Sequence, residues 1–172
     1  MDQITNWSTP IAELKIRLVS KLQEALVASD IRNTGRHFMT HDQKPISHDQ
    51  QAKWFYEQYR PEHHKGNLHL FAGYIAGEPA AYGLVVRRVG DYWVTGVISP
   101  EYRGQGYGKQ LFEHMGNYVF ETLDADVITL DVLPTNMPAR KLYESLGYQY
   151  KEQPRVDGTL VMRKVRDDAR EK

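Results

Sequence analysis

The sequence predicts a mixed α/β fold with a largely antiparallel sheet, flanked by about four helices. Three strand-like segments follow one another with only tight turns between them, which predicts an antiparallel meander. Helical segments precede this meander and strand–helix units follow it, so both kinds of element are mixed along the chain. No repeat or linker divides the 172 residues, so we expect a single domain over 1–172, with 1–13 and 166–172 at its periphery.

Composition excludes several classes of function. Lys and Arg total 22, as do Asp and Glu, so no net positive charge is available to attract nucleic acid or a membrane surface. The absence of cysteine excludes disulfides, thiolate metal sites and a cysteine nucleophile, and none of the seven histidines has zinc-ligand spacing. The start MDQITNW lacks a signal-peptide pattern, and no apolar stretch has the roughly 20 residues of a membrane span. We therefore expect a cytoplasmic protein without a metal, nucleic-acid or membrane partner.

The first predicted elements are a strand and a helix. Apolar residues recur at every second position in 14–18, which is the period of a half-buried strand. Ser20 with Gln23 resembles a capping box and predicts a helix from there to about Ile31. One amphipathic helix opening at Thr9-Pro10 is the alternative, but strand then helix fits the local pattern better.

A polar connection over 32–47 leads to a second helix. Ser47 with Gln50 is a capping-box pattern, and an aromatic stripe at helical spacing follows as far as Arg60-Pro61. Such a stripe is typical of a face packed in the core. Long connections in compact domains are often functional.

The meander is predicted to contain strands 68–76, 80–89 and 92–99, with turns at Gly77-Glu78 and Gly90-Asp91.

A helix is expected from about Gly106 to Glu121, and the apolar run 127–132 predicts a buried strand. Pro138 is suited to the first turn of another helix, which Gly147 would end. Segments 148–151 and 159–165 complete the predicted sheet.

A glycine-rich loop precedes the helix that begins near residue 106. Glycine at 104, 106 and 108 lets several backbone N–H groups converge beside the positive end of this helix, which favours an anion. A dinucleotide fingerprint would need glycine at Lys109, and a Walker A loop would need glycine at Arg103 and Ser or Thr at Gln110. The loop alone therefore predicts a phosphate site, with an ordinary glycine-rich turn as the alternative.

The run from Val97 to Gly108 resembles motif A of the GNAT N-acetyltransferase superfamily. The core of that motif is Arg or Gln, two residues, Gly, one residue, then Gly or Ala, and Arg103, Gly106 and Gly108 satisfy it. The later segment resembles the second cofactor-binding segment of the family through Leu130, Asp131, Val132, Asn136, Ala139, Tyr143, Gly147 and Tyr148. The resemblance covers 14–165 and implies the GNAT fold, with a central parallel strand pair splayed at a cofactor slot.

The resemblance implies transfer of the acetyl group of acetyl-CoA to a primary amine by direct attack in a ternary complex. Gly96, Val97 and Ile98 would pair their backbone with the pantetheine arm, and Asn136 would be a helix cap, a cofactor contact, or both. The residues implied at the pyrophosphate are Arg103, Gly104, Gln105, Gly106, Tyr107, Gly108 and Lys109.

Gly96 also has a meaning of its own. A lone glycine in a strand often marks a bulge or a close backbone approach. A bulge there would splay this strand from 127–132 and open the slot.

Two residues are candidates for catalysis. Tyr143 lies where the family places its general acid, with packing on the sheet as the alternative. Asp131 aligns with an acidic base of some relatives, with capping of the next turn as the alternative. Backbone N–H groups near Val97 and Ile98 could stabilise the oxyanion. Other candidates for a base acting through water are Glu62, His63, His64 and His69, although surface solvation explains the adjacent histidines more simply.

The acceptor site is expected in the connection 33–47, the helix after it and the loop 153–158. The pattern Ile31-Arg32-Asn33, Arg36, Met39, Ile46-Ser47 and Trp54 looks similar to family members that acetylate nucleotide-linked amino sugars. Other small amines and a protein N-terminus stay open, as does a role for Arg32 and Arg36 with an anionic acceptor. The alternatives are a non-catalytic acyl-CoA-binding sensory module of the same fold and a nucleotide-phosphate binder unrelated to CoA. The sequence also leaves a homodimer open.

Overall fold

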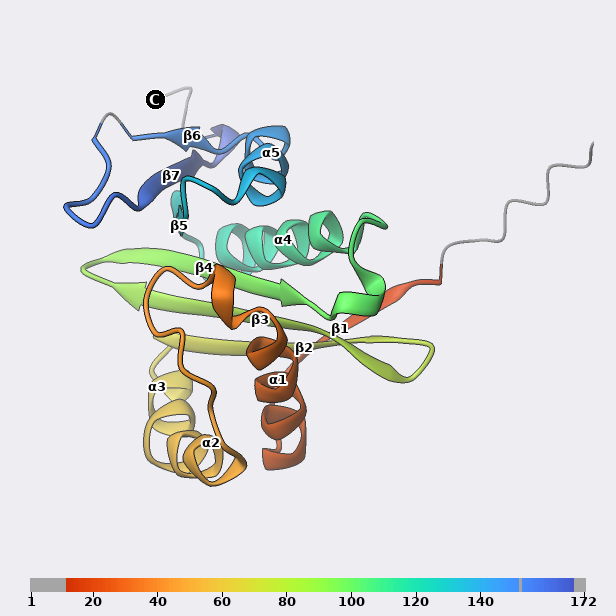
Figure 1. Cartoon of the computed structure of the whole chain (residues 1–172). Coiled ribbons are helices and arrows are strands. Elements are labelled where there is room, and N and C mark those ends of the chain that lie inside the picture. The colour runs from red at the N-terminus through yellow and green to blue at the C-terminus, as the bar shows by residue number, and fades with distance from the viewer. Residues whose placement is uncertain (1–11, 152, 169–172) are drawn as a thin grey trace, which may run out of the picture.

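The computed structural model describes residues 12–151 and 153–168, and in them one seven-stranded sheet has the order β1-β2-β3-β4-β5-β7-β6. Only β4 and β5 run parallel, while the other neighbours are antiparallel. Helices α1–α3 cover one face, and α4 and α5 cover the other (Figure 1). The predicted mixed fold is confirmed. The strands are β1 Leu14–Leu18, β2 Leu68–Ile75, β3 Glu78–Arg88, β4 Asp91–Ile98, β5 Val127–Val132, β6 Gln149–Tyr150 and β7 Leu160–Val165; the helices are α1 Leu22–Thr34, α2 His48–Trp54, α3 Arg60–His64, α4 Tyr107–Asn117 and α5 Met137–Ser145.

The start of α1 is capped by a different residue from the one predicted. The Glu24 carboxylate accepts from the backbone N–H of Ser20 at 2.9 Å and of Lys21 at 3.1 Å. The predicted pairing of Ser20 with Gln23 is therefore wrong by one position, because the helix begins at Leu22 and its third residue is Glu24.

The second helix begins as predicted but continues further. Ser47 and Gln50 form the expected capping box. The helix was predicted to end at Arg60-Pro61, yet it passes through a widened π turn over Phe55–Tyr59 and continues as α3 to His64. Pro61 is the second residue of α3 and follows directly after the π turn.

Two hairpin turns join β2, β3 and β4, each one residue earlier than predicted. Ala76-Gly77 has φ of 49° and 81°, and Val89-Gly90 has φ of 49° and 87°. Two successive residues with positive φ match the twist of the flanking strands, and glycine takes the second position in each turn. Glu78 and Asp91 therefore begin strands instead of ending turns.

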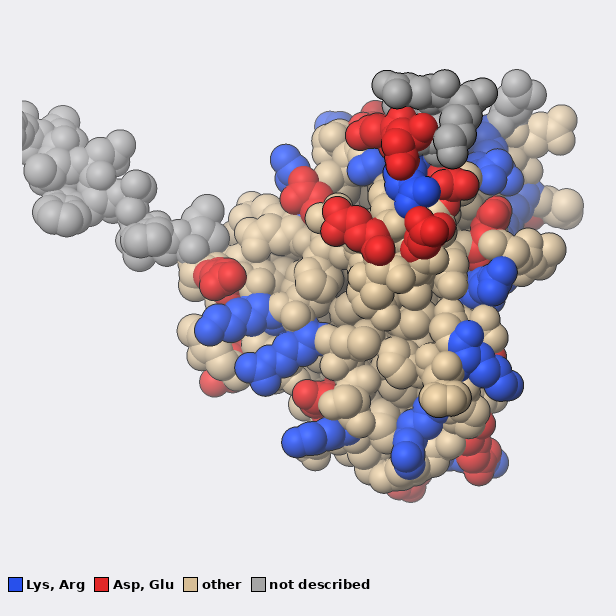
Figure 2. All heavy atoms as spheres, turned by 180° about the vertical axis from the view of Figure 1, so that it is seen from behind, with Lys and Arg blue, Asp and Glu red and all other residues tan. Residues whose placement is uncertain are grey.

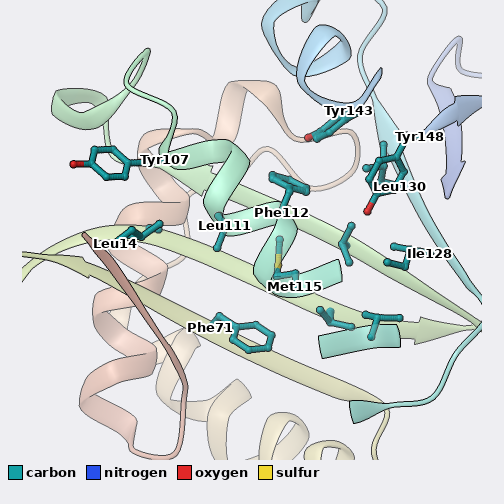
Figure 3. Packing of buried hydrophobic residues seen from close by; sticks show 14 of the residues in the cluster. Leu14, Phe71, Tyr107, Leu111, Phe112, Met115, Ile128, Leu130, Tyr143 and Tyr148 are labelled. Atoms are coloured by element: carbon teal, nitrogen blue, oxygen red, sulfur yellow. The ribbon is translucent and has the colours of Figure 1, made fainter. Parts of the chain in front are cut away.

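Helix α4 lies on a pair of glycines in the sheet. Gly83 of β3 pairs with Gly96 of β4, and the β3–β4 register has no break, so the predicted bulge at Gly96 is wrong. A Cβ atom on Gly96 would lie 2.8 Å from Leu111 Cδ2, and one on Gly83 would lie 2.8 Å from Met115 Sδ. The alternative prediction, a close backbone approach, is the correct one, because the absent side chains let α4 pack directly on the strands (Figure 3).

The predicted periphery is anchored where it is described. Backbone and guanidinium groups of Arg166 bind Asp126, and its side chain also pairs with Asp124 and Asp168 at 2.8–2.9 Å. The rest of the predicted extension and tail, 1–11 and 169–172, lies outside the described residues. Acidic and basic side chains intermingle on the face shown in Figure 2, as equal totals of the two charges suggest. Among the described residues, no helix has the length and apolarity needed to cross a bilayer.

A buried histidine joins β2 to the turn after α4. His69 is 3% exposed; its Nε2–H donates to Gly66 O at 3.1 Å, so Nδ1 accepts from the Tyr118 hydroxyl at 2.9 Å. The ring also lies edge-on to His63 and Tyr118. Burial lowers the pKa of His69, so the folded protein holds it neutral.

Acid is therefore expected to destabilise the fold through His69. Above the ordinary histidine pKa of about 6.5 the group contributes no penalty; as pH falls below that value the unfolded chain binds the proton first, so the free energy of unfolding decreases. Urea unfolding at about pH 7.5 and about pH 5.5 should show a larger loss for the wild type than for His69→Gln, by at most about 1.4 kcal/mol per pH unit. The exposed His37→Gln should behave like the wild type, and equal losses in wild type and His69→Gln would contradict this account.

Candidate active site

The central feature of the site is a fork between β4 and β5. The two strands pair only at Tyr92 with Ile128 and at Trp93 with Thr129. Beyond these pairs β4 stays on β3 as far as Ile98, while β5 stays on β7 as far as Val132. The predicted splayed pair is confirmed, but each strand simply follows its other neighbour and no bulge is involved.

The fork opens into a cavity of about 520 Å³. It is walled by β4, the end of β5, the glycine loop, the start of α5 and the connection after α1. The predicted residues that line it are Gly96, Val97, Ile98, Arg103, Gly104, Gly108, Asp131, Asn136 and Tyr143. Gln105, Gly106, Tyr107 and Lys109 do not line it.

Backbone groups of β4 face the open side of the fork. Ser99 N–H donates to Ala80 O at 2.8 Å, and hydrogen-bonded pairs alternate along an antiparallel ladder. The backbone of Val97 is therefore engaged by β3, whereas the N–H groups of Gly96 and Ile98 point into the gap. Arg103 Nε–H donates to Ile98 O at 2.9 Å, which occupies that carbonyl.

The glycine loop exposes the N-terminus of α4. Gly104 and Gly106 have φ of 72° and 88°, and no side chain caps the helix. A Cβ atom on either glycine would meet nothing within 4 Å, so space surrounds the loop. The first N–H groups of a helix have no partner within it, and here they remain available to an anion.

Neighbouring side chains in this loop point elsewhere. Tyr107 is 3% exposed, and its hydroxyl donates to Ala12 O at 2.7 Å, so only its backbone can serve a ligand here. Gln105 Nε2–H donates to Glu101 O at 3.1 Å, and Lys109 is exposed on the helix.

Asn136 caps α5 by accepting from Ala139 N–H at 3.3 Å, so the cap is confirmed.

Tyr143 lies between the cavity and the core. Its ring lies 4.9 Å from that of Phe112 and 6.0 Å from that of Tyr148, and Figure 3 shows it beside both. Burial, and next the negative charge of Asp131, raise the pKa of Tyr143 well above the ordinary tyrosine value. Its phenol is therefore fully protonated at neutral pH. The predicted packing role is present, and Tyr143 also lines the cavity.

Asp131 stands where two cavities meet. It lines the main cavity and also a second one of about 180 Å³ on the α1 side of the sheet. Its Oδ1 accepts from Thr40 Oγ1 at 2.7 Å, and its Oδ2 lies 2.9 Å from His41 Nε2 and 3.6 Å from Arg155. The partners of Asp131 come from segments that lie far away in the sequence. These contacts therefore do not show the alternative role, in which Asp131 would cap the turn after its own strand.

The two segments expected to form the acceptor site do meet here. The connection 33–47 supplies Thr40 and His41, and the loop 153–158 supplies Arg155, which lies 4.9 Å over the Trp93 ring. Helix α2 lines neither cavity.

Arg32 and Arg36 hold the shape of the connection. Arg32 is 7% exposed, and its guanidinium donates to the carbonyls of Asp42 and Lys44. Arg36 donates to Gln43 O at 3.3 Å. These contacts give both side chains a structural use, and Arg32 also lines the second cavity.

Sequence reasoning missed Thr40, His41, Trp93 and Arg155. His41 stands in a polar segment without a motif, and nothing in its neighbours indicates a partner far along the chain. The other base candidates, Glu62, His63, His64 and His69, line neither cavity. Glu62 is bound by Lys65 and Asn67, which lower its pKa, and His69 belongs to the cluster with Tyr118. Among the described residues, no group of three or more His, Asp or Glu side chains could hold a metal ion.

Solved structures with the same fold include several acetyltransferases. The protein yncA from Salmonella typhimurium, solved with its cofactor acetyl-CoA, has a TM-score of 0.73 at 15% identity, covering 90% of this chain and 95% of that one. Ribosomal-protein-S5-alanine acetyltransferase from Vibrio fischeri gives 0.73 at 15%, covering 90% and 94%. Spermidine N-acetyltransferase from Vibrio cholerae, solved with CoA and spermine, gives 0.72 at 17%, covering 88% and 95%.

Comparison at the level of sequence gives the family. No curated protein matches the chain significantly. The sequence model of the acetyltransferase (GNAT) family matches residues 34–148, which include the connection, the fork, the glycine loop and Tyr143. This chain belongs to the GNAT family of acetyltransferases.

Proposed function

We propose that this protein is an N-acetyltransferase that moves the acetyl group of acetyl-CoA to a primary amine by direct attack in a ternary complex. The fork between β4 and β5 is the observation that carries the proposal, because it joins a backbone-lined slot to a second cavity through one carboxylate. Family membership supports acetyl transfer in general.

The donor side would be recognised mainly by backbone groups. Gly96 and Ile98 would donate N–H groups to the pantetheine arm, with Val97 contributing its side chain to the wall. The N–H groups of the glycine loop and of the first turn of α4 would hold the pyrophosphate. Arg103, Gln105 and Lys109 would lie around it, Tyr107 would serve through its backbone, and Asn136 would border the arm.

The two catalytic candidates both line the slot. Tyr143 would give its proton to the departing thiolate. A backbone N–H of β4 that faces the gap would stabilise the oxyanion. The raised pKa of Tyr143 makes its phenol a weaker acid. It also keeps the phenol protonated until the C–S bond breaks and the thiolate forms. Asp131, at the junction, would support removal of a proton from the amine.

The acceptor is a primary amine that reaches the second cavity. An amino-sugar nucleotide, another small amine and a protein N-terminus are the candidates. Two similar structures are named for different acceptors, a ribosomal-protein alanine and spermidine, so the shared fold does not choose among them.

Acetyl-CoA should stabilise the protein against heat, and NAD and ATP should not. A ligand at 100 times its Kd stabilises the folded state by about 2.7 kcal/mol, which a thermal shift readily detects. Thiol release should then be measured with spermine, an alanine-terminated peptide and a nucleotide-linked amino sugar. Stabilisation by ATP alone would point to a nucleotide binder, and acetyl-CoA binding without turnover of any amine would point to a sensory module.

Tyr143→Phe should lower kcat by roughly 100-fold, the lower end for loss of a general acid, and leave acetyl-CoA binding unchanged. The wild type should show no loss of activity from ionisation of this phenol below about pH 10, because burial raises its pKa. Tyr56→Phe, which removes the hydroxyl of a tyrosine that is 52% exposed, is the matched control. Unchanged kcat in Tyr143→Phe would restrict this residue to packing.

A further inference from the structure

The second cavity lies between the strands β3 and β4 and the segment that follows α1. Side chains at every second position of a strand lie on one face of the sheet, so Tyr82 and Arg88 of β3 face the same way, and both line this cavity. Arg32 near the end of α1 lines it as well, and Figure 1 shows the connection after α1, in orange, passing over these strands. A space of about 180 Å³ is thus bordered by two guanidinium groups and one phenol.

Arg32 carries a buried charge whose hydrogen-bond partners are all neutral. The residue is 7% exposed, and its guanidinium donates to the backbone carbonyls of Asp42 and Lys44 and to the side-chain oxygen of Asn33. None of the ion pairs between described residues involves Arg32. Buried charges in proteins are usually paired with an opposite charge, so an anion in this cavity would supply the missing partner.

The Tyr82 hydroxyl is a second group without a partner. Tyr82 is 8% exposed, and in the part of the chain that the structure describes its hydroxyl makes no hydrogen bond, although buried tyrosine hydroxyls usually make one. Burial raises the pKa of Tyr82 to about 12, and the positive charges of Arg32 and Arg88 oppose this rise. Since both charges act on the hydroxyl, the three groups lie near one another, and the hydroxyl keeps a proton to donate.

Arg88 supplies an accessible charge at the hairpin end of the cavity. It is exposed, and its guanidinium carbon lies 6.0 Å from the centre of the Trp93 ring. That of Arg155 lies 4.9 Å from the same centre, so Trp93 has two guanidinium groups beside it. A guanidinium over an aromatic ring is oriented by the ring and still presents its N–H groups to an oxyanion.

The carboxylate of Asp131 borders the same cavity from β5. Asp131 lies at the junction with the slot, where the proposed function places the acceptor amine. The other carboxylate in the lining, that of Asp42, is exposed and accepts from the Lys44 N–H at 2.9 Å. Positive groups on one side and Asp131 on the other suit a ligand that carries both an amine and an anion.

We propose that the acceptor carries an oxyanion, either a phosphate or a carboxylate, and that Arg32, Tyr82 and Arg88 bind this group in the second cavity. The proposal rests on the proposed acetyltransferase function, which places the amine of the same molecule at Asp131. An oxyanion would neutralise the buried charge of Arg32 and accept from the Tyr82 hydroxyl and the Arg88 guanidinium. The cavity has the volume of about six water molecules in the liquid, which is room for such a group and a few linking atoms.

The test measures kcat/KM by thiol release for two pairs of amines, each differing in an oxyanion. O-phosphoethanolamine is compared with ethanolamine for phosphate, and alanine with alaninamide for carboxylate. The wild type should prefer the anionic member of at least one pair. Arg88→Gln should reduce this preference roughly 10-fold, because hydrogen bonds between charged groups are the strong ones, and Tyr82→Phe should reduce it in the same direction. A general loss of folding would lower both members of a pair equally and leave the preference unchanged.

Two matched controls should leave the preference as it is. Arg87→Gln changes the neighbouring exposed arginine, which lines neither cavity. Tyr56→Phe removes the hydroxyl of an exposed tyrosine that lines neither cavity.

A binding measurement gives a reading without turnover. The protein is first loaded with CoA, so that the proposed pyrophosphate site is filled, and is then titrated calorimetrically with O-phosphoethanolamine and with alanine. We expect saturable binding of at least one of them, weakened roughly 10-fold in Arg88→Gln and unchanged in Arg87→Gln.

The outcomes separate the two proposals. A wild type that acetylates both members of each pair with equal kcat/KM, and binds neither anionic amine, overturns the oxyanion site and leaves the acetyltransferase intact. A preference that Arg88→Gln and Tyr82→Phe leave unchanged also overturns the site. A wild type that binds O-phosphoethanolamine through Arg88, yet acetylates no amine, supports the oxyanion site and contradicts the acetyltransferase function.

Discussion

The site depends on where the pairing of β4 with β5 stops. Two residue pairs join these strands, and past Trp93 each belongs to a different half of the sheet. Helix α4 contacts both halves, because it packs directly on Gly83 and Gly96 and brings Phe112 against Tyr143. A sheet with full β4–β5 pairing would consume the backbone groups of Gly96 and Ile98, and no slot would remain. The close seating of the helix and the incomplete ladder are thus two aspects of the same arrangement.

One carboxylate connects the chemistry on the two sides of the fork. The pKa of Tyr143 is raised first by burial and next by Asp131, whose carboxylate also lies 2.9 Å from His41 Nε2 at the second cavity. A negative charge there opposes loss of the phenol proton, so Tyr143 stays protonated at neutral pH. Thr40 and Arg155, which lie in two different loops, hold the Asp131 carboxylate in position.

Local sequence patterns predicted most of the helices and strands. Contacts between segments that lie far apart in the chain could not be predicted in this way. Strand 127–132, the Ser47 cap and the tight glycine turn before α4 depend on neighbouring residues, and these structural predictions are confirmed. The prediction of a bulge at Gly96 was wrong. A glycine in a strand can mark either a bulge or the close approach of a helix, and the sequence does not distinguish the two. The approach of His41 and Arg155 to Asp131 required the fold, since each lies in an irregular segment whose path is set by tertiary contacts such as those of Arg32. The predicted end of the second helix at Pro61 and the predicted positions of the two hairpin turns were wrong. Both depend on backbone turn geometry, which single residues do not specify.

In the proposed function the donor would be held mainly by main-chain atoms, while the acceptor side would be formed by side chains on loops. Peptide N–H groups are the same whichever amino acid carries them, so the donor slot is largely insensitive to side-chain identity. The segments 36–47 and 153–158 lie outside the hydrogen-bonded ladder of the sheet, and their side chains contact it at Asp131, Trp93 and Thr95. Met39 and Thr40 of the first segment line both cavities, so a change in this segment would reshape both sides of the fork together.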